Sequence, residues 1–190
     1  MNIEKITELH TLFSRTENRI KSMEYDGEGL DIPAINELRY VGFHLLKYLI
    51  SSSESELDKA VNHAKRAFYD ACESSVVLHL SKIKEFEEKY QSVISISDVI
   101  KDYPDRRAKA EQARRFLQDS DRQDKVSFYA EAEQHLEILE NLSLVLFASK
   151  GDLDAKIRDQ RKQVRRWAIG IAVGCASALL GLVTKQLGMW

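Results

Sequence analysis

The last 24 residues of the chain contain a run that limits how the chain can fold. Residues 167–184 read WAIGIAVGCASALLGLVT and include no Asp, Glu, Lys, Arg or His. As a helix, this run would be about 27 Å long, close to the roughly 30 Å apolar thickness of a bilayer. The sequence therefore predicts a single transmembrane helix over residues 167–187. The alternative is a C-terminal helix buried in the core.

Charged side chains are distributed unevenly around this run. Residues 1–151 carry 21 basic and 27 acidic side chains, residues 152–166 carry six basic and three acidic ones, and residues 167–190 carry only Lys185. Basic residues are typical of the cytoplasmic border of a membrane helix. We therefore expect a cytoplasmic helical domain over 1–151 and a basic juxtamembrane helix over 152–166. The predicted location is the inner (cytoplasmic) membrane, with a single pass.

The N-terminal sequence and the residues just before the apolar run also bear on the membrane prediction. The chain starts with MNIEKITELH, which has no apolar run, so we expect no signal peptide. At the other end, four basic side chains precede the apolar run, and we expect them to contact anionic lipid headgroups. These are Arg161, Lys162, Arg165 and Arg166.

The remainder of the chain has few residues that break helices. The whole chain has 2 Pro and 8 Gly, and its apolar residues recur at steps of three and four. The pattern predicts helices over about 2–24, 33–50, 53–90, 104–120 and 122–149, whereas residues 91–103 allow no assignment. Ser53 and Glu56 match a capping box, and Gly151 matches a helix C-cap. We predict an all-α fold, a helical bundle whose long C-terminal helix continues into the transmembrane anchor.

A heptad pattern begins after Gly151 and continues into the apolar run. Its soluble members, the predicted stalk, are Leu153, Ile157, Gln160 and Val164. The residues expected to pack within the membrane are the small ones Gly170, Gly174, Ala178 and Gly181. Small residues let helix backbones approach closely, so the pattern predicts a homo-oligomer formed through this helix. The alternative is that its first half packs on the chain's own body.

Motifs for enzyme chemistry are scarce. The sequence has no phosphate-binding loop, no nucleophile elbow and no Cys/His spacing typical of zinc. We therefore expect no cofactor and no metal. The net charge of −2 gives no general attraction to nucleic acid, so nucleic acid is not an expected partner.

One short motif stands apart from this background. Residues 39–44 read RYVGFH, an Arg and a His separated by four residues. The motif resembles the R-x(4–6)-H signature of HEPN proteins, small all-helical domains of prokaryotic antiviral defence that are often dimeric ribonucleases. The resemblance implies that Arg39 and His44 are candidate catalytic residues at a site shared by two protomers. Tyr40 stands where that family usually has Asn, His or Asp. The alternative is that Arg39 lies on a helix surface and His44 is a hydrogen-bonded structural residue.

Three functions stay open. The leading hypothesis is a non-enzymatic, tail-anchored, self-associating membrane effector of the membrane-perturbing or pore type, as in toxin-like and antiviral-defence proteins of prokaryotes. The second is a membrane-tethered ribonuclease of the HEPN type that uses Arg39 and His44. The third is a tail-anchored adaptor whose helical body docks a cytosolic protein partner. The trigger and the oligomer number are not predicted.

Overall fold

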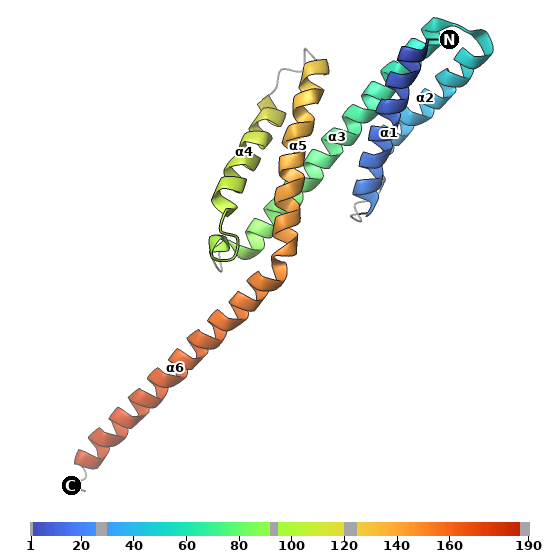
Figure 1. Cartoon of the computed structure of the whole chain (residues 1–190). Coiled ribbons are helices and arrows are strands. Elements are labelled where there is room, and N and C mark those ends of the chain that lie inside the picture. Colours follow the sequence, from blue (N-terminus) through green and yellow to red (C-terminus); the bar gives the residue numbers. More distant parts are fainter. Residues whose placement is uncertain (1, 26–29, 92–94, 120–124, 187–190) are drawn as a thin grey trace.

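The computed structural model describes residues 2–25, 30–91, 95–119 and 125–186, without the side chains of 117–119, 125–131 and 181–186. This part of the chain is almost entirely helical, which confirms the all-α prediction (Figure 1). The elements are α1 (Ile3–Tyr25), α2 (Ile32–Ser51), α3 (Glu54–Tyr90), the 3-10 helix η1 (Ile96–Asp98), α4 (Tyr103–Asp119), α5 (Lys125–Ala148) and α6 (Lys150–Gln186).

The long helix α3 is the axis of the fold. Helices α1 and α2 pack on its first half, and α5 packs on its second half together with α4 (Figure 1). The core consequently has two main parts. One lies around Leu57 and Val61 of α3 and includes Leu9 of α1 and Val41 of α2. The other lies around Phe86 and joins α3, η1, α4, α5 and the start of α6.

Helix α2 starts and ends at residues suited to those positions. Asp31 is the N-cap, with one carboxylate oxygen accepting the backbone N–H of Ala34, and Pro33 occupies the first turn. At the other end Ser52 has a φ of 53° and donates its backbone N–H to the carbonyl of Tyr48. The chain reverses here, so α2 and α3 lie side by side as a helical hairpin (Figure 1).

The predicted capping box at the start of α3 is not formed. Ser53 is the N-cap but makes no side-chain capping bond. The Glu56 carboxylate instead contacts His44 of α2 and Lys59. A tertiary contact has therefore replaced the local one that the sequence pattern indicated.

Gly151 is not the C-cap that the sequence predicts, although the predicted helix end near residue 149 is one residue from the observed end. Helix α5 ends at Ala148 and α6 begins at Lys150, which places Gly151 in the first turn of α6. Ser149 bridges the two helices, because its N–H and hydroxyl both donate to the carbonyl of Val145 while its own carbonyl accepts the N–H of Leu153. With these bonds made, the junction needs no glycine.

The start of α6 is fixed to the body. Leu153 is fully buried, and Ile157 packs against the same core cluster. The Tyr90 hydroxyl donates to Asp154 at 2.9 Å, and Lys156 pairs with Asp98 of η1 at 2.9 Å. Beyond these contacts α6 leaves the body and extends away from it (Figure 1).

The predicted transmembrane helix over 167–187 is wrong for the structure as described. Among the residues that the structure describes, none of the helices combines enough length with enough apolar character to cross a bilayer. Arg165 and Arg166 lie directly before residues 167–180, the uncharged stretch whose side chains are described. Gly181 lies outside the described side chains.

Candidate functional site

The α2–α3 hairpin carries a stack of rings that includes one residue of the R-x(4–6)-H motif. Tyr40 of α2 stacks on His63 of α3 with ring centroids 5.2 Å apart. His63 in turn stacks on His44 of α2 at 5.1 Å, with only 10° between the ring planes. The Phe43 ring meets the His44 ring edge-on, with the ring centroids 5.3 Å apart. Tyr40 and His44 are one helical turn apart, so both face α3 from the same side of α2.

Each imidazole of the stack is held by a carboxylate from the opposite helix. The His44 Nδ1 lies 2.7 Å from a Glu56 oxygen, and the His63 Nδ1 lies 2.6 Å from a Glu37 oxygen. The Lys59 ammonium and then His44 hold the pKa of Glu56 down at about 2, so this carboxylate is ionised at neutral pH. A carboxylate on Nδ1 fixes the orientation of each ring and leaves Nε2 as the atom available for acid–base chemistry.

Two cations lie at the ends of the stack. The Arg39 guanidinium lies over the Tyr40 ring at 5.3 Å, and the Lys47 ammonium lies over the Phe43 ring at 4.5 Å. In order along the stack, Tyr40 and His63 therefore separate Arg39 from His44. Within one chain the two motif residues belong to the same array, but they do not contact each other among the interactions of the described residues.

Sequence reasoning predicted neither His63 and Glu56 as partners of His44 nor Glu37 as the partner of His63. The hairpin is the sequence signal that could have identified these partners. Because the chain reverses at Ser52 and Ser53, residues of α2 and α3 at similar distances from the turn lie opposite one another. Both imidazoles are partly buried, with side chains 14% and 19% exposed. Next to them the outer face of α2 remains open. Its exposed apolar side chains are Phe43, Leu46, Leu49 and Ile50.

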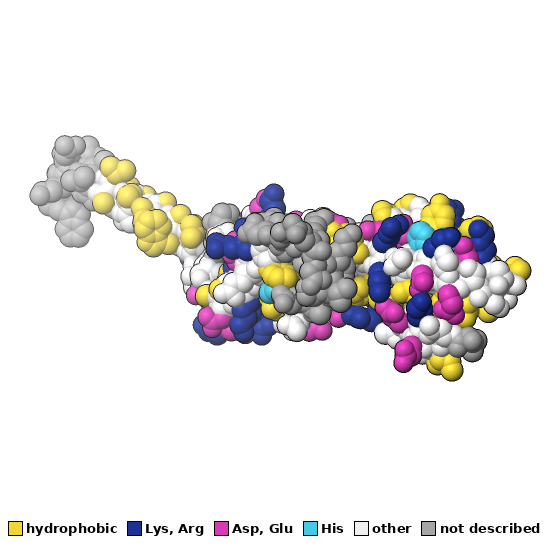
Figure 2. Space-filling view, turned by 90° about the horizontal axis from the view of Figure 1, so that it is seen from above, with side chains coloured by type: hydrophobic (Ala, Val, Ile, Leu, Met, Phe, Trp, Pro, Cys, Tyr) yellow, Lys and Arg dark blue, Asp and Glu magenta, His cyan; other side chains and the backbone are white. Residues whose placement is uncertain are grey.

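The second candidate region is the part of α6 that leaves the body, residues 158–180, here named the projecting segment. Every side chain in it is exposed in the single chain. Figure 2 shows apolar side chains along its length. Large apolar residues in it are exposed to between 46% and 70%: Val164, Trp167, Ile169, Ile171, Val173, Leu179 and Leu180.

The predicted stalk residues therefore divide into two pairs. Leu153 and Ile157 pack in the chain's own core. This agrees with the alternative prediction, in which the first half of this helix packs on the chain's own body. Gln160 and Val164 lie in the projecting segment and are exposed. Any contact between α6 helices of different chains along this seam must therefore begin near Gln160.

Basic side chains occupy the base of the projecting segment. The four predicted headgroup contacts, here named the basic collar, are all exposed: Arg161, Lys162, Arg165 and Arg166. Lys162 makes a long ion pair with Asp159 at 3.4 Å. Farther along, a Cβ added to Gly170 or Gly174 would meet nothing within 4 Å, and Ala178 is exposed. The small-residue face is open in the single chain.

Comparison with protein-family models, with curated proteins and with solved structures found no match for this chain. Among the described residues, no group of three or more His, Cys, Asp or Glu side chains is arranged to hold a metal ion. The ring stack and the projecting segment are therefore the features that bear on function.

Proposed function

We propose that the protein is a non-enzymatic, self-associating helical protein that assembles through the projecting segment of α6. The observation that carries this proposal is the exposure of every described side chain from residue 158 to residue 180, on a helix anchored to the body at its start. A long apolar helix surface left open to water marks a contact site.

The energetic argument rests on the apolar side chains of this segment. Trp167 is 70% exposed and Val164 65% exposed in the single chain. Covering a Val, Leu, Ile or Phe side chain fully is worth about 1.5–3 kcal/mol. Several such side chains lie on one helix, so their combined burial is large enough to offset the entropy lost on association.

The spacing of the segment selects one face for the contact. Gln160, Val164, Trp167, Ile171 and Gly174 follow one another at steps of four and three residues. Two copies that pair in parallel place identical members of this seam opposite one another. Gly174 has open space around it, so a second helix can approach there without a clash.

The basic collar adds a surface on which the assembly would act. Its four side chains are exposed beside the apolar part of the segment, an arrangement typical of helices that lie on anionic lipid headgroups. We propose that the assembled chains bind anionic lipid through this collar. Flotation with anionic vesicles should recover the full chain, and Arg165→Gln with Arg166→Gln should reduce the recovered fraction.

The test of self-association is the mass of the full chain in solution. Sedimentation velocity should give a mass that is a multiple of 21.8 kDa. Gly174→Leu should lower that mass, because the added side chain fills the space that a partner helix needs. Ala176→Leu is the matched control: it adds a similar volume about 200° around the helix from Gly174 and should leave the mass unchanged. A 21.8 kDa monomer for the unaltered chain would refute the proposal.

A second candidate function is RNA cleavage at the ring stack. The observation that favours it is the pair of imidazoles whose Nδ1 atoms are each held by a glutamate, which orients both rings. His44 would act as the acid or base at Nε2, and Arg39 would stabilise negative charge on the phosphate. The HEPN resemblance implies the same two residues.

Cleavage of a labelled RNA by the full chain tests this candidate. His44→Ala should abolish cleavage, whereas His10→Ala, which alters an exposed histidine of α1, should not. Cleavage that survives His44→Ala would exclude this site. An absence of cleavage in the unaltered chain would leave the non-enzymatic proposal as the account of the protein.

A further inference from the structure

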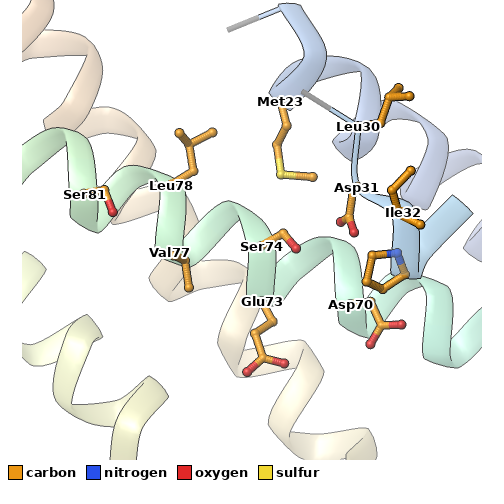
Figure 3. Close-up of a pocket in the computed structure, with 11 residues that line it drawn as sticks. Met23, Leu30, Asp31, Ile32, Asp70, Glu73, Ser74, Val77, Leu78 and Ser81 are labelled. Carbon is orange, nitrogen blue, oxygen red and sulfur yellow. The ribbon is translucent and has the colours of Figure 1, made fainter. Parts of the chain in front are cut away.

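A groove lies where the end of α1 and the start of α2 meet the middle of α3 (Figure 3). Its volume is about 680 Å³, and the ring stack and the projecting segment do not line it. Its lining includes Met23, Asp31, Asp70, Ser74 and Leu78. Polar and apolar side chains therefore share one concave surface, as in sites for small organic groups.

Asp31 is the most informative residue of the groove. Its side chain is used as the N-cap of α2, where Oδ1 accepts the N–H of Ala34 at 3.3 Å. The second oxygen, Oδ2, is buried and has no hydrogen-bond partner among the described residues, and the residue as a whole is only 9% exposed. A buried carboxylate oxygen without a donor is costly, so this atom is poised to accept a hydrogen bond from a ligand.

The charge around the groove is negative. Burial raises the pKa of Asp70, and the nearby carboxylates of Glu37, Asp31 and Glu73 raise it further, against the opposing effect of Arg66. The start of α2 contributes only about half a positive charge, which one carboxylate more than offsets. A cation would relieve this repulsion.

The walls of the groove are apolar. Met23 and Leu78 are almost fully buried, and the exposed side chains of Leu30, Ile32 and Val77 line the groove as well. In Figure 3, Asp31 and Ser74 lie toward one another, beside Met23, whereas Asp70 and Glu73 project farther from Met23. Of the polar side chains labelled in Figure 3, those of Asp31 and Ser74 lie nearest to Met23.

We infer that this groove binds an organic cation, an ammonium or guanidinium group attached to an apolar body. The N–H donors of such a group would bond to Asp31 Oδ2 and Ser74 Oγ, and its apolar body would pack on Met23 and Leu78. A bare metal ion is a poorer fit, because the described carboxylates do not gather as a metal-binding group. This inference is independent of self-association through α6.

Isothermal titration calorimetry on the full chain tests the inference with phenethylammonium chloride as the probe. Asp31→Asn is the key variant, because Asn is an equally good N-cap and keeps α2 intact while removing the charge. We expect the unaltered chain to bind the amine and Asp31→Asn to bind it at least about tenfold more weakly. Asp58→Asn, which alters an exposed carboxylate paired with Lys5, is the control and should bind like the unaltered chain.

Further arms of the experiment separate charge from apolar contact and identify the source of the cation. The uncharged 2-phenylethanol should bind more weakly than the amine, and Ser74→Ala should weaken amine binding. A blocked Leu-Lys dipeptide that binds tighter than the amine would point to a side chain of a partner polypeptide, and the reverse order to a free amine. Absence of amine binding at millimolar concentration, or equal binding by Asp31→Asn, would overturn the inference.

Discussion

Replacement of Trp167 by Ala perturbs the proposed α6 contact at its largest side chain. Trp167 is 70% exposed in the single chain. An aromatic side chain buries about 200 Å², so about 140 Å² of this one is open to a partner. If a second helix covers half of that surface, at about 25 cal/mol per Å², the substitution removes about 1.8 kcal/mol per chain and about twice that for a pair. The dissociation constant of a dimer should therefore rise about 300-fold.

Sedimentation equilibrium over a range of chain concentrations measures this constant. Leu180→Ala is the comparison, because Leu180 is 66% exposed but lies on another face of α6 from the seam. Its effect on the dissociation constant should stay below about threefold. Equal weakening by both substitutions would show that apolar area alone drives association, and an unchanged constant for Trp167→Ala would refute the seam.

Other expected outcomes concern the body of the chain. Leu139→Ala should lower the free energy of unfolding by about 2–5 kcal/mol in a urea titration, since Leu139 is fully buried between helices; a loss below about 1 kcal/mol would contradict close packing there. Because the pKa of Glu56 is lowered to about 2, its contribution to stability is present above the unfolded-state value of 4.5 and is lost as the pH falls toward 2. Glu56→Gln should remove that part of the pH dependence, and a variant with an unchanged pH profile would argue against the His44 and Lys59 contacts. Burial raises the pKa of the Cys72 thiol to about 11, so in a Cys175→Ser chain Cys72 should react with a thiol reagent at pH 8 only after unfolding; fast reaction of the folded chain would show that α3 is not packed as described.

The helices of the body were predictable because apolar periodicity and chain breakers agree along most of it. The pattern predicts a helix over 33–50, and α2 runs from Ile32 to Ser51. The start of α6 was not predictable in the same way. Gly151 resembles a C-cap, but the Ser149 bonds and the burial of Leu153 decide that junction, and both depend on packing against α3 and η1.

The candidate sites were predictable only in part. The spacing of Arg39 and His44 could be read from the sequence, but the insertion of His63 between Tyr40 and His44 depends on the alignment of α2 with α3. The seam of α6 was visible as a heptad pattern, yet periodicity alone could not show where the helix leaves the body. The unpartnered Asp31 oxygen could not be predicted, because the sequence does not distinguish an N-cap aspartate with a free second oxygen from one whose two oxygens are both bonded.

Disulfide cross-linking along α6 tests the central claim most directly, because it reports contact between helices of different chains. In a Cys175→Ser background, Cys72 is buried and one new cysteine can be placed on or off the seam. Ile171→Cys lies on the seam, and Ile169→Cys lies on the opposite face. The account predicts that mild oxidation links two chains through position 171 but not through position 169. Equal linkage at both positions, or no linkage at position 171, would contradict it.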